Sequence, residues 1–352
     1  MAKPREVKME MSPIRLELMS PCGPVLSNHA GCLIRNTLYV HGGINKYLSK
    51  EPLNTFYKLD LNSPSPIWTE ILDRNSPHLS HHACLVLDNR YILFIGGWNG
   101  RHRTADMWAY DVQEATWIGL ATSGFPEGAG LSSHAVVLLA DGNILVVGRE
   151  GSARIQRRYG NSWIIRGNVM NGHFAYNEHN LSLASRSGHT MHVTGSQLTI
   201  IGGRCDRPVE QHSGYRALTS SSSSSSSLSS TSSLSSSSSS SAAFFGQLNE
   251  FVRRASPLAK PPCGRKQHVS VSGSGLVLIH GGETFDGRSR HPVGDFYLLS
   301  LRPNVKWYHL GSSGVGRAGH VCCVSDDKIV IHGGLGPRNA VYGDSYVIKL
   351  SN

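Results

Sequence analysis

Arginines recur in this chain at places where several of them could bind one ligand together. Arg186, Arg265 and Arg317 each stand three residues before a histidine that opens a repeated segment, and other arginines follow glycine doublets in those segments. A guanidinium offers parallel N–H donors that match a carboxylate, so a ring of them would capture an acidic peptide or protein surface. The candidate partner-binding residues are Arg101, Arg103, Arg186, Arg204, Arg265, Arg288, Arg317 and Arg338.

Other interpretations of the basic residues stay open on the sequence alone. Arg186, Arg265 and Arg317 would equally serve by pairing with neighbouring loops and holding the fold together, and the other five would then be ordinary solvated loop charges. The formal net charge of +10 suits an acidic protein, a nucleic acid or an anionic membrane. Nucleic acid is disfavoured because no aromatic-rich binding motif accompanies the basic residues.

Histidine is the other abundant reactive residue type, but its placement favours a structural role. Six of the 18 histidines open the repeated segments at equivalent positions, which indicates a hydrogen-bonding scaffold rather than metal ligands. The sequence contains no strong metal-ligand spacing, no phosphate-binding glycine loop and no nucleophile elbow. We therefore expect no catalytic residue, no metal and no cofactor. The six histidines are His29, His82, His134, His189, His268 and His320.

A glycine doublet follows five of these histidines by 13 or 14 residues and ends a short apolar run, and the degenerate pair Gly148-Arg149 takes its place after His134. From one doublet to the next the steps are 54, 52, 54, 79 and 52 residues. Glycine at the end of a buried strand permits positive φ and close backbone approach. A repeat near 50 residues with this signature predicts a β-propeller. The repeat glycines are Gly42, Gly43, Gly96, Gly97, Gly148, Gly202, Gly203, Gly281, Gly282, Gly333 and Gly334.

Six such repeats predict one all-β domain over residues 1–352, a six-bladed propeller with four strands in each blade. The last repeat ends after its third strand, while residues 14–19 alternate apolar and polar side chains ahead of the first repeat. We expect this N-terminal strand to supply the missing fourth strand of the sixth blade. Such closure would remove the exposed edges of an open ring.

The fourth repeat carries an insertion that explains the step of 79 residues. A serine tract over 219–241 is predicted to be disordered, because it cannot bury a core. An apolar stripe over 244–255 predicts an amphipathic helix. This helix either covers its own blade or presents a face to a partner.

The repeat pattern resembles that of kelch proteins over nearly the whole chain. The runs GLSSH (Gly130–His134), VVGREG (Val146–Gly151), QRRYG (Gln156–Gly160) and SRSGH (Ser185–His189) are similar to the kelch domain-containing protein 9 family. That resemblance implies a small propeller that is not an enzyme and acts as a protein-interaction module, with an A-type cyclin as its partner.

Related kelch proteins imply an alternative function, that of a substrate receptor of a cullin ubiquitin ligase recognising acidic or C-terminal peptides. A propeller enzyme is the lesser alternative. No apolar h-region and no stretch of 18 apolar residues occurs in the sequence, so no membrane association is expected. We expect a cytoplasmic monomer, with a nuclear location as the alternative.

Overall fold

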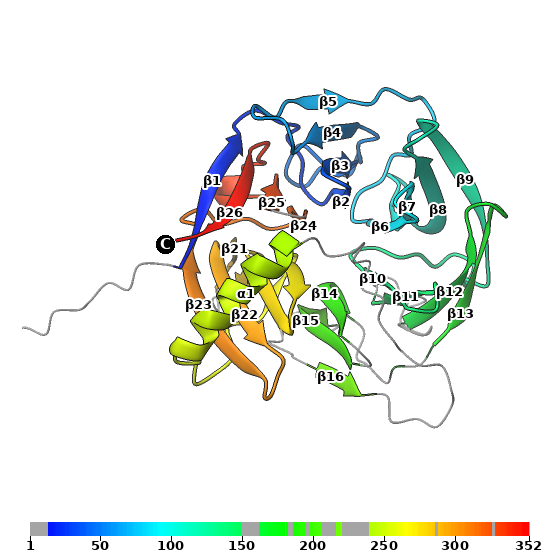
Figure 1. The fold of residues 1–352 in the computed structure, drawn as a ribbon. Coiled ribbons are helices and arrows are strands. Elements are labelled where there is room, and N and C mark those ends of the chain that lie inside the picture. Colours follow the sequence, from blue (N-terminus) through cyan, green and yellow to red (C-terminus); the bar gives the residue numbers. More distant parts are fainter. Residues whose placement is uncertain are drawn as a thin grey trace, which may run out of the picture.

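The chain folds into a six-bladed β-propeller, with the blades arranged around a central channel (Figure 1). The computed structural model describes residues 13–148, 162–179, 181, 186–194, 197–205, 216–219, 239–285, 288–325 and 328–351. The innermost strands of neighbouring blades contact one another all the way around the ring. The all-β, six-bladed architecture predicted from the repeat is therefore confirmed.

The blades follow the chain in order, each strand antiparallel to the next. Blade 1 contains β2 (Ala30–Ile34), β3 (Thr37–His41), β4 (Phe56–Asp60) and β5 (Trp68–Glu70). Blade 2 contains β6 (Ala83–Leu87), β7 (Tyr91–Trp98), β8 (Arg103–Asp111) and β9 (Thr116–Ser123). Blade 3 contains β10 (Ala135–Leu138), β11 (Ile144–Val147), β12 (Ser162–Asn168) and β13 (His173–Glu178).

The second half of the ring carries the irregular features. Blade 4 contains β14 (Arg186–Thr194), β15 (Gln197–Cys205) and β16 (Arg216–Thr219) in the part described. Blade 5 contains β18 (Val269–Gly273), β19 (Leu276–His280), β22 (Asp295–Ser300) and β23 (Lys306–Ser312). Its loops add a small sheet of β17 (Arg265–Lys266), β20 (Glu283–Phe285) and β21 (Arg290–Pro292). Blade 6 contains β24 (Val321–Val324), β25 (Ile329–His332), β26 (Ser345–Leu350) and β1 (Ile14–Ser20).

The second strand of each blade is the most deeply buried, because blades pack on both of its faces. In β11, β19 and β25 every residue is buried. Their sequences are continuous apolar runs rather than alternating ones, with a buried histidine at the end of β19 and β25, as expected for a strand without a solvent face. These runs build the hydrophobic core between adjacent blades and fix the position of the glycine doublets at their ends.

The N-terminal strand closes the ring, as predicted. β1 pairs antiparallel with β26, with Ile14 opposite Leu350 and Leu16 opposite Ile348. The buried side chain of Ile14 joins the core of blades 5 and 6. The two ends of the chain are thereby held in one sheet, which leaves blade 6 with a full set of four strands.

The insertion in blade 4 leads into helix α1 (Ser239–Arg254). Residues 220–238 of the predicted disordered tract lie outside the described residues, whereas Thr219 belongs to β16 and Ser239–Ser241 to α1. The helix packs its apolar face, with Phe245 and Leu248 buried, against the cores of blades 5 and 6. Within the described residues, the ring of Phe245 lies against Gly273 of β18, so the helix covers an apolar surface of blade 5. Among the described residues, no helix is long and apolar enough to span a membrane.

Candidate partner-binding face

The repeat histidine fits between two blades, and this explains its fixed distance from the glycine doublet. The Cβ of His29 would lie 2.7 Å from a side chain built on Gly43 in its own blade. Its Cε1 would lie 2.9 Å from one built on Gly333 in the preceding blade. Gly43 and Gly333 also have φ values of 82° and 69°, where other L-residues are strained. Glycine is therefore required on both sides of the imidazole.

The same contact with the preceding blade occurs at every junction of the ring. The pairs are Gly42 with His82, Gly96 with His134, Gly148 with His189, Gly202 with His268, and Gly281 with His320. Burial lowers the pKa of His134 to about 4 and that of His268 to about 3. The imidazoles are thus neutral, buried packing groups at physiological pH.

The residue directly before each repeat histidine belongs to a closed ring of backbone hydrogen bonds. Each N–H donates to the carbonyl of the equivalent residue in the preceding blade, over distances of 2.7 to 2.8 Å. All six residues have positive φ, which turns their peptide groups towards one another around the channel. They are Asn28, His81, Ser133, Gly188, Gln267 and Gly319.

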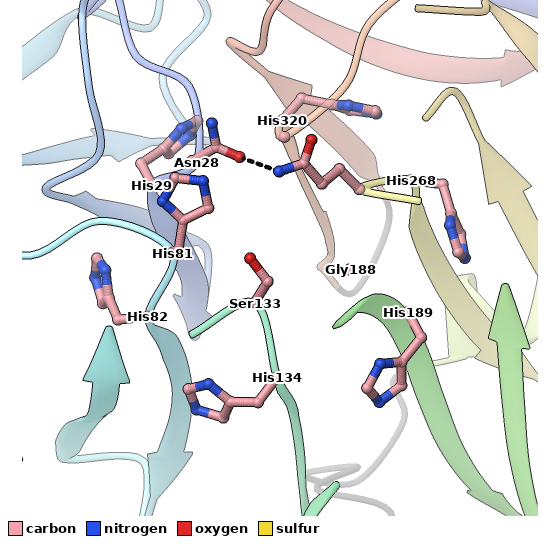
Figure 2. Close-up of a pocket in the computed structure, with 12 residues that line it drawn as sticks. Asn28, His29, His81, His82, Ser133, His134, Gly188, His189, His268 and His320 are labelled. Carbon is pink, nitrogen blue, oxygen red and sulfur yellow. Dashed lines mark hydrogen bonds between the residues drawn. The ribbon is translucent and has the colours of Figure 1, made fainter. Parts of the chain in front are cut away.

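This ring surrounds one end of the channel and lines a cavity of about 220 Å³ together with the repeat histidines (Figure 2). The side-chain amide of Gln267 donates to Oδ1 of Asn28 at 3.0 Å, across the position of Gly319. The cavity is therefore lined by amide, hydroxyl and imidazole groups, with glycine at two of the six inner positions. We did not predict these residues, because the types at this position differ between repeats and only their place before the histidine is shared.

Arg186, Arg265 and Arg317 lie inside the ring rather than on its surface. Their exposed fractions are 7%, 5% and 1%. In each, Nη1 donates to the carbonyl of the first glycine of its own doublet at 2.9 to 3.0 Å, namely Gly202, Gly281 and Gly333. The structure corrects the partner-binding hypothesis for these three, because their guanidiniums are enclosed and already bound to backbone. It favours the structural alternative.

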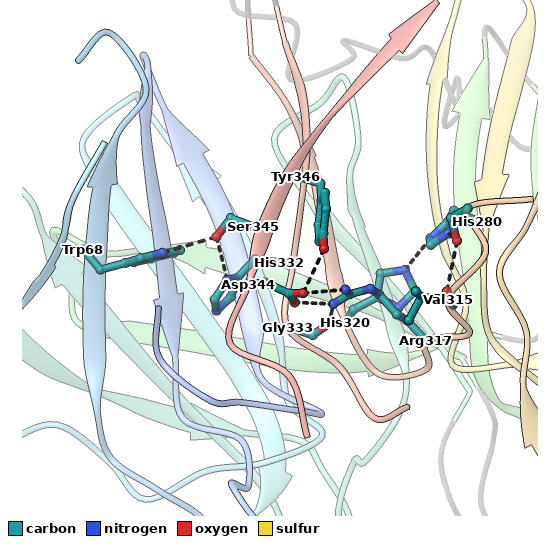
Figure 3. A network of polar contacts seen from close by, with 11 residues as sticks. Trp68, His280, Val315, Arg317, His320, His332, Gly333, Asp344, Ser345 and Tyr346 are labelled. Carbon is teal, nitrogen blue, oxygen red and sulfur yellow. Dashed lines mark hydrogen bonds and ion pairs between the residues drawn. The ribbon is translucent and has the colours of Figure 1, made fainter. Parts of the chain in front are cut away.

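Arg317 shows how complete this enclosure is (Figure 3). Its guanidinium forms two hydrogen bonds with the carboxylate of Asp344, at 2.7 and 2.9 Å. It also lies over the rings of Tyr342 and Tyr346, 4.4 and 5.1 Å from their centres. Burial acts to raise the pKa of Asp344, but the hydrogen bonds and charge of Arg317 outweigh it and hold that pKa below its usual value.

The other five candidate arginines lie on one face of the disc, which we call the b–c rim. It consists of the loops between the second and third strands of each blade and the turns that lead into the next blade. Isolated bridges such as Ser80 with Trp98 and Ala318 with Leu335 join these two kinds of segment. Arg101, Arg288 and Arg338 are exposed on this rim, and Arg103 and Arg204 are half-buried in it. The structure thus brings five of the eight candidate residues to the same face.

The other end of the channel is wider and lined by thiols. A cavity of about 780 Å³ is bordered by Cys32, Cys84, Cys322 and Cys323 from blades 1, 2 and 6. Burial raises the pKa of Cys322 to about 12 and shifts that of Cys323 in the same direction. The described residues contain no group of three or more histidine, cysteine or acidic side chains that could hold a metal ion.

Kelch proteins are among the known proteins that this chain resembles. The family model for the KLHDC2/KLHL20/DRC7 Kelch-repeats domain matches residues 11–203. Kelch domain-containing protein 9 of Homo sapiens is 29% identical over 321 residues, covering 88% of this chain and 87% of that protein. Kelch domain-containing protein 3 of Homo sapiens is 24% identical over 353 residues, covering 90% and 79%. The solved structure of YjhT has a TM-score of 0.63 at 14% identity over 95% of this chain and 99% of its own, a likeness of fold alone.

Proposed function

The chain belongs to the kelch-repeat family, and from that membership we propose that it is a non-enzymatic protein-interaction module. Propellers of this family typically bind other proteins. We propose that the b–c rim is the binding face and that the partner presents an acidic segment to it. The carboxylates of that segment would pair with Arg101, Arg204 and Arg288, while Arg103 and Arg338 add positive charge around them.

The observation that carries this proposal is the distribution of arginines between two environments. Arg186, Arg265 and Arg317 are buried inside the ring, whereas on one face Arg101, Arg288 and Arg338 are exposed and Arg103 and Arg204 are half-buried. Positive potential concentrated on one face of a disc steers an acidic partner to that face. The same face surrounds the polar cavity at the channel end, so a bound segment has both charge and hydrogen-bonding groups within reach.

An A-type cyclin is the specific partner that we propose, because the resemblance to the kelch domain-containing protein 9 family implies it. The direct test is a calorimetric titration of the purified propeller with a purified A-type cyclin. Charge reversal at Arg101, Arg204 and Arg288 to glutamate is expected to weaken binding by at least about 100-fold. Equal affinity for the wild type and the variant would contradict the assignment of the face.

A matched control reverses three arginine charges at positions away from the b–c rim. Arg166, Arg254 and Arg302 are exposed and lie on strand β12, at the end of α1 and in the turn after β22. Their replacement by glutamate changes the net charge equally but leaves the b–c rim intact. If this control lost as much affinity as the rim variant, net charge rather than the rim would account for binding.

A second candidate function is that of a substrate receptor for a cullin ubiquitin ligase. The small polar cavity at the ring of backbone hydrogen bonds favours it, since its size suits the end of a peptide rather than a broad protein surface. In this case a cullin complex would co-purify with the tagged propeller from cells. Replacement of Gln267 by alanine would then reduce substrate binding and leave cullin recovery unchanged.

A further inference from the structure

One loop on the b–c rim exposes two large apolar side chains next to its basic residues. The loop follows β3 in blade 1, and in it Tyr47 and Leu48 are 44% and 75% exposed. The turn is closed by the N–H of Ser49, which donates to the carbonyl of Lys46 at 3.2 Å. Tyr47 and Leu48 therefore occupy the two central positions of a β-turn and point away from the core of the propeller.

Leu48 holds a backbone conformation that its side chain does not favour. Its φ is +58°, at a turn position where glycine or asparagine is normally selected. A branched residue in this region is strained, and such strain usually persists where packing of the side chain compensates it. The side chain of Leu48 is mostly exposed, so the free protein gains little from having leucine there. This combination indicates a side chain that is available for contact with another molecule.

The loop is joined to the basic part of the rim. The indole N–H of Trp98 in blade 2 donates to the carbonyl of Lys50 at 2.8 Å. A side chain built on Gly100 would touch Pro52, so the loops of blades 1 and 2 lie against each other. The exposed Arg101 follows directly in the same loop of blade 2. Apolar and cationic groups thus form one continuous surface.

The charge of this surface selects the partner. Lys46, Lys50 and Arg101 flank the two apolar side chains, and Glu51 is the acidic residue of the blade 1 loop. We propose that Tyr47 and Leu48 form an apolar hot spot that binds a large apolar side chain of an acidic partner segment. Hot spots of protein interfaces are enriched in tyrosine and arginine, and this surface presents Tyr47 and Arg101. This inference rests on the proposed function and specifies which kind of partner side chain the same rim recognises.

The experiment uses a phage library of random 12-residue peptides, panned against the full-length wild-type protein and its variants. The wild type is expected to enrich peptides in which acidic residues flank a leucine or an aromatic residue. Leu48→Gly is expected to keep the acidic preference and lose the apolar one. Charge reversal at Arg101, Arg204 and Arg288 is expected to keep the apolar preference and lose the acidic one.

The best enriched peptide is then synthesised with a fluorophore and its affinity is measured by anisotropy. Leu48→Gly should weaken its binding by about tenfold or more. Ile67→Gly removes an equally exposed apolar side chain, 78% exposed, at the opposite end of blade 1 and should change affinity less than twofold. The melting temperature of Leu48→Gly should equal or exceed that of the wild type, because glycine relieves the positive φ. This separates lost contact from lost folding.

The outcomes distinguish this inference from the proposed function. If the wild type enriches acidic peptides without an apolar residue, or if Leu48→Gly keeps the apolar preference, the hot spot is overturned while the basic face stands. If the wild type enriches no acidic peptides, the proposed function fails and the inference fails with it.

Discussion

His41 lies against His82 across the junction between blades 1 and 2, with Nδ1 of His41 3.0 Å from Nε2 of His82. The same contact joins His280 to His320, also at 3.0 Å, between blades 5 and 6. In each pair one ring must donate its N–H and the other must accept with a bare nitrogen, which a protonated partner cannot do. The junctions therefore depend on neutral histidine.

The first prediction is that acid destabilises the ring. Burial lowers the pKa of His41 and of His280 to about 3, whereas an unfolded histidine titrates near 6.5. Between these values the unfolded state binds more protons, so stability falls as the pH falls below about 6.5. At pH 5 each such group would cost about 2 kcal/mol of unfolding free energy. Urea unfolding measured at pH 8, 7, 6 and 5 checks this. An unchanged midpoint down to pH 5 would contradict the neutral pairs.

The second prediction concerns the buried arginine of blade 6. Arg317→Met removes the partner of Asp344 and the donor to Gly333, and should destabilise the protein by about 3 to 5 kcal/mol. Arg101→Met on the exposed rim should stay within about 0.5 kcal/mol of the wild type. The double variant with Asp344→Asn should recover part of the loss, because no unpaired carboxylate is left. Chemical denaturation of the wild type, Arg317→Met, Asp344→Asn and the double variant measures the coupling between the two residues. Strictly additive losses would refute that coupling.

The third prediction tests the closure of the ring. Deletion of residues 1–19 removes most of β1 and the buried Ile14, and exposes the edge of β26. The melting temperature should fall by about 10 °C or more, since several buried apolar contacts are lost. Deletion of residues 1–12 leaves β1 intact and serves as the control. Equal melting temperatures for the two truncated proteins would show that β1 does not stabilise the ring.

The fourth prediction separates the thiols by reactivity. Cys22 and Cys263 are exposed, whereas Cys32 and Cys323 are buried beside the channel. Burial raises the pKa of Cys323, and a hydrogen bond with Cys84 together with burial raises that of Cys32. Iodoacetamide at pH 8 should label the two exposed thiols at least about tenfold faster, because the thiolate is the reacting species. Peptide mass spectrometry over time gives the rates, and similar rates at all four sites would show that the channel is open to reagents.

The repeat could be predicted because its residue types are fixed by backbone geometry. A histidine packed against the first glycine of the preceding blade leaves no room for a side chain there, so that glycine recurs at the same spacing in every blade, whereas the second position is Arg149 in the third repeat. The strand over 14–19 was predictable for a similar reason, since the last repeat lacked a partner for β26. Because the same geometry recurs in six blades, the spacing of residues along the sequence is sufficient to predict the fold.

The same reasoning did not predict the direction of side chains in loops. Arg317 and Arg338 are both arginines near a blade end, yet one is enclosed by Asp344 and two tyrosines and the other is exposed. Spacing contains no information on which way such a side chain turns. The stripe on α1 predicted an apolar face but not that blade 5 would cover it, because periodicity does not identify the surface against which a helix packs. No sequence pattern identifies Leu48 as a contact residue, since its positive φ is a property of the folded turn.

The ring of six backbone hydrogen bonds has an electrostatic consequence. Its N–H and C=O groups run head to tail around the channel, so their dipoles lie along the circle and cancel in sum. A helix end, by contrast, points its dipoles at a ligand and attracts an anion without any charged side chain. This channel mouth has no such field of its own. Its preference for charge is therefore set entirely by the side chains around it, and a few substitutions on the rim could change that preference without disturbing the ring.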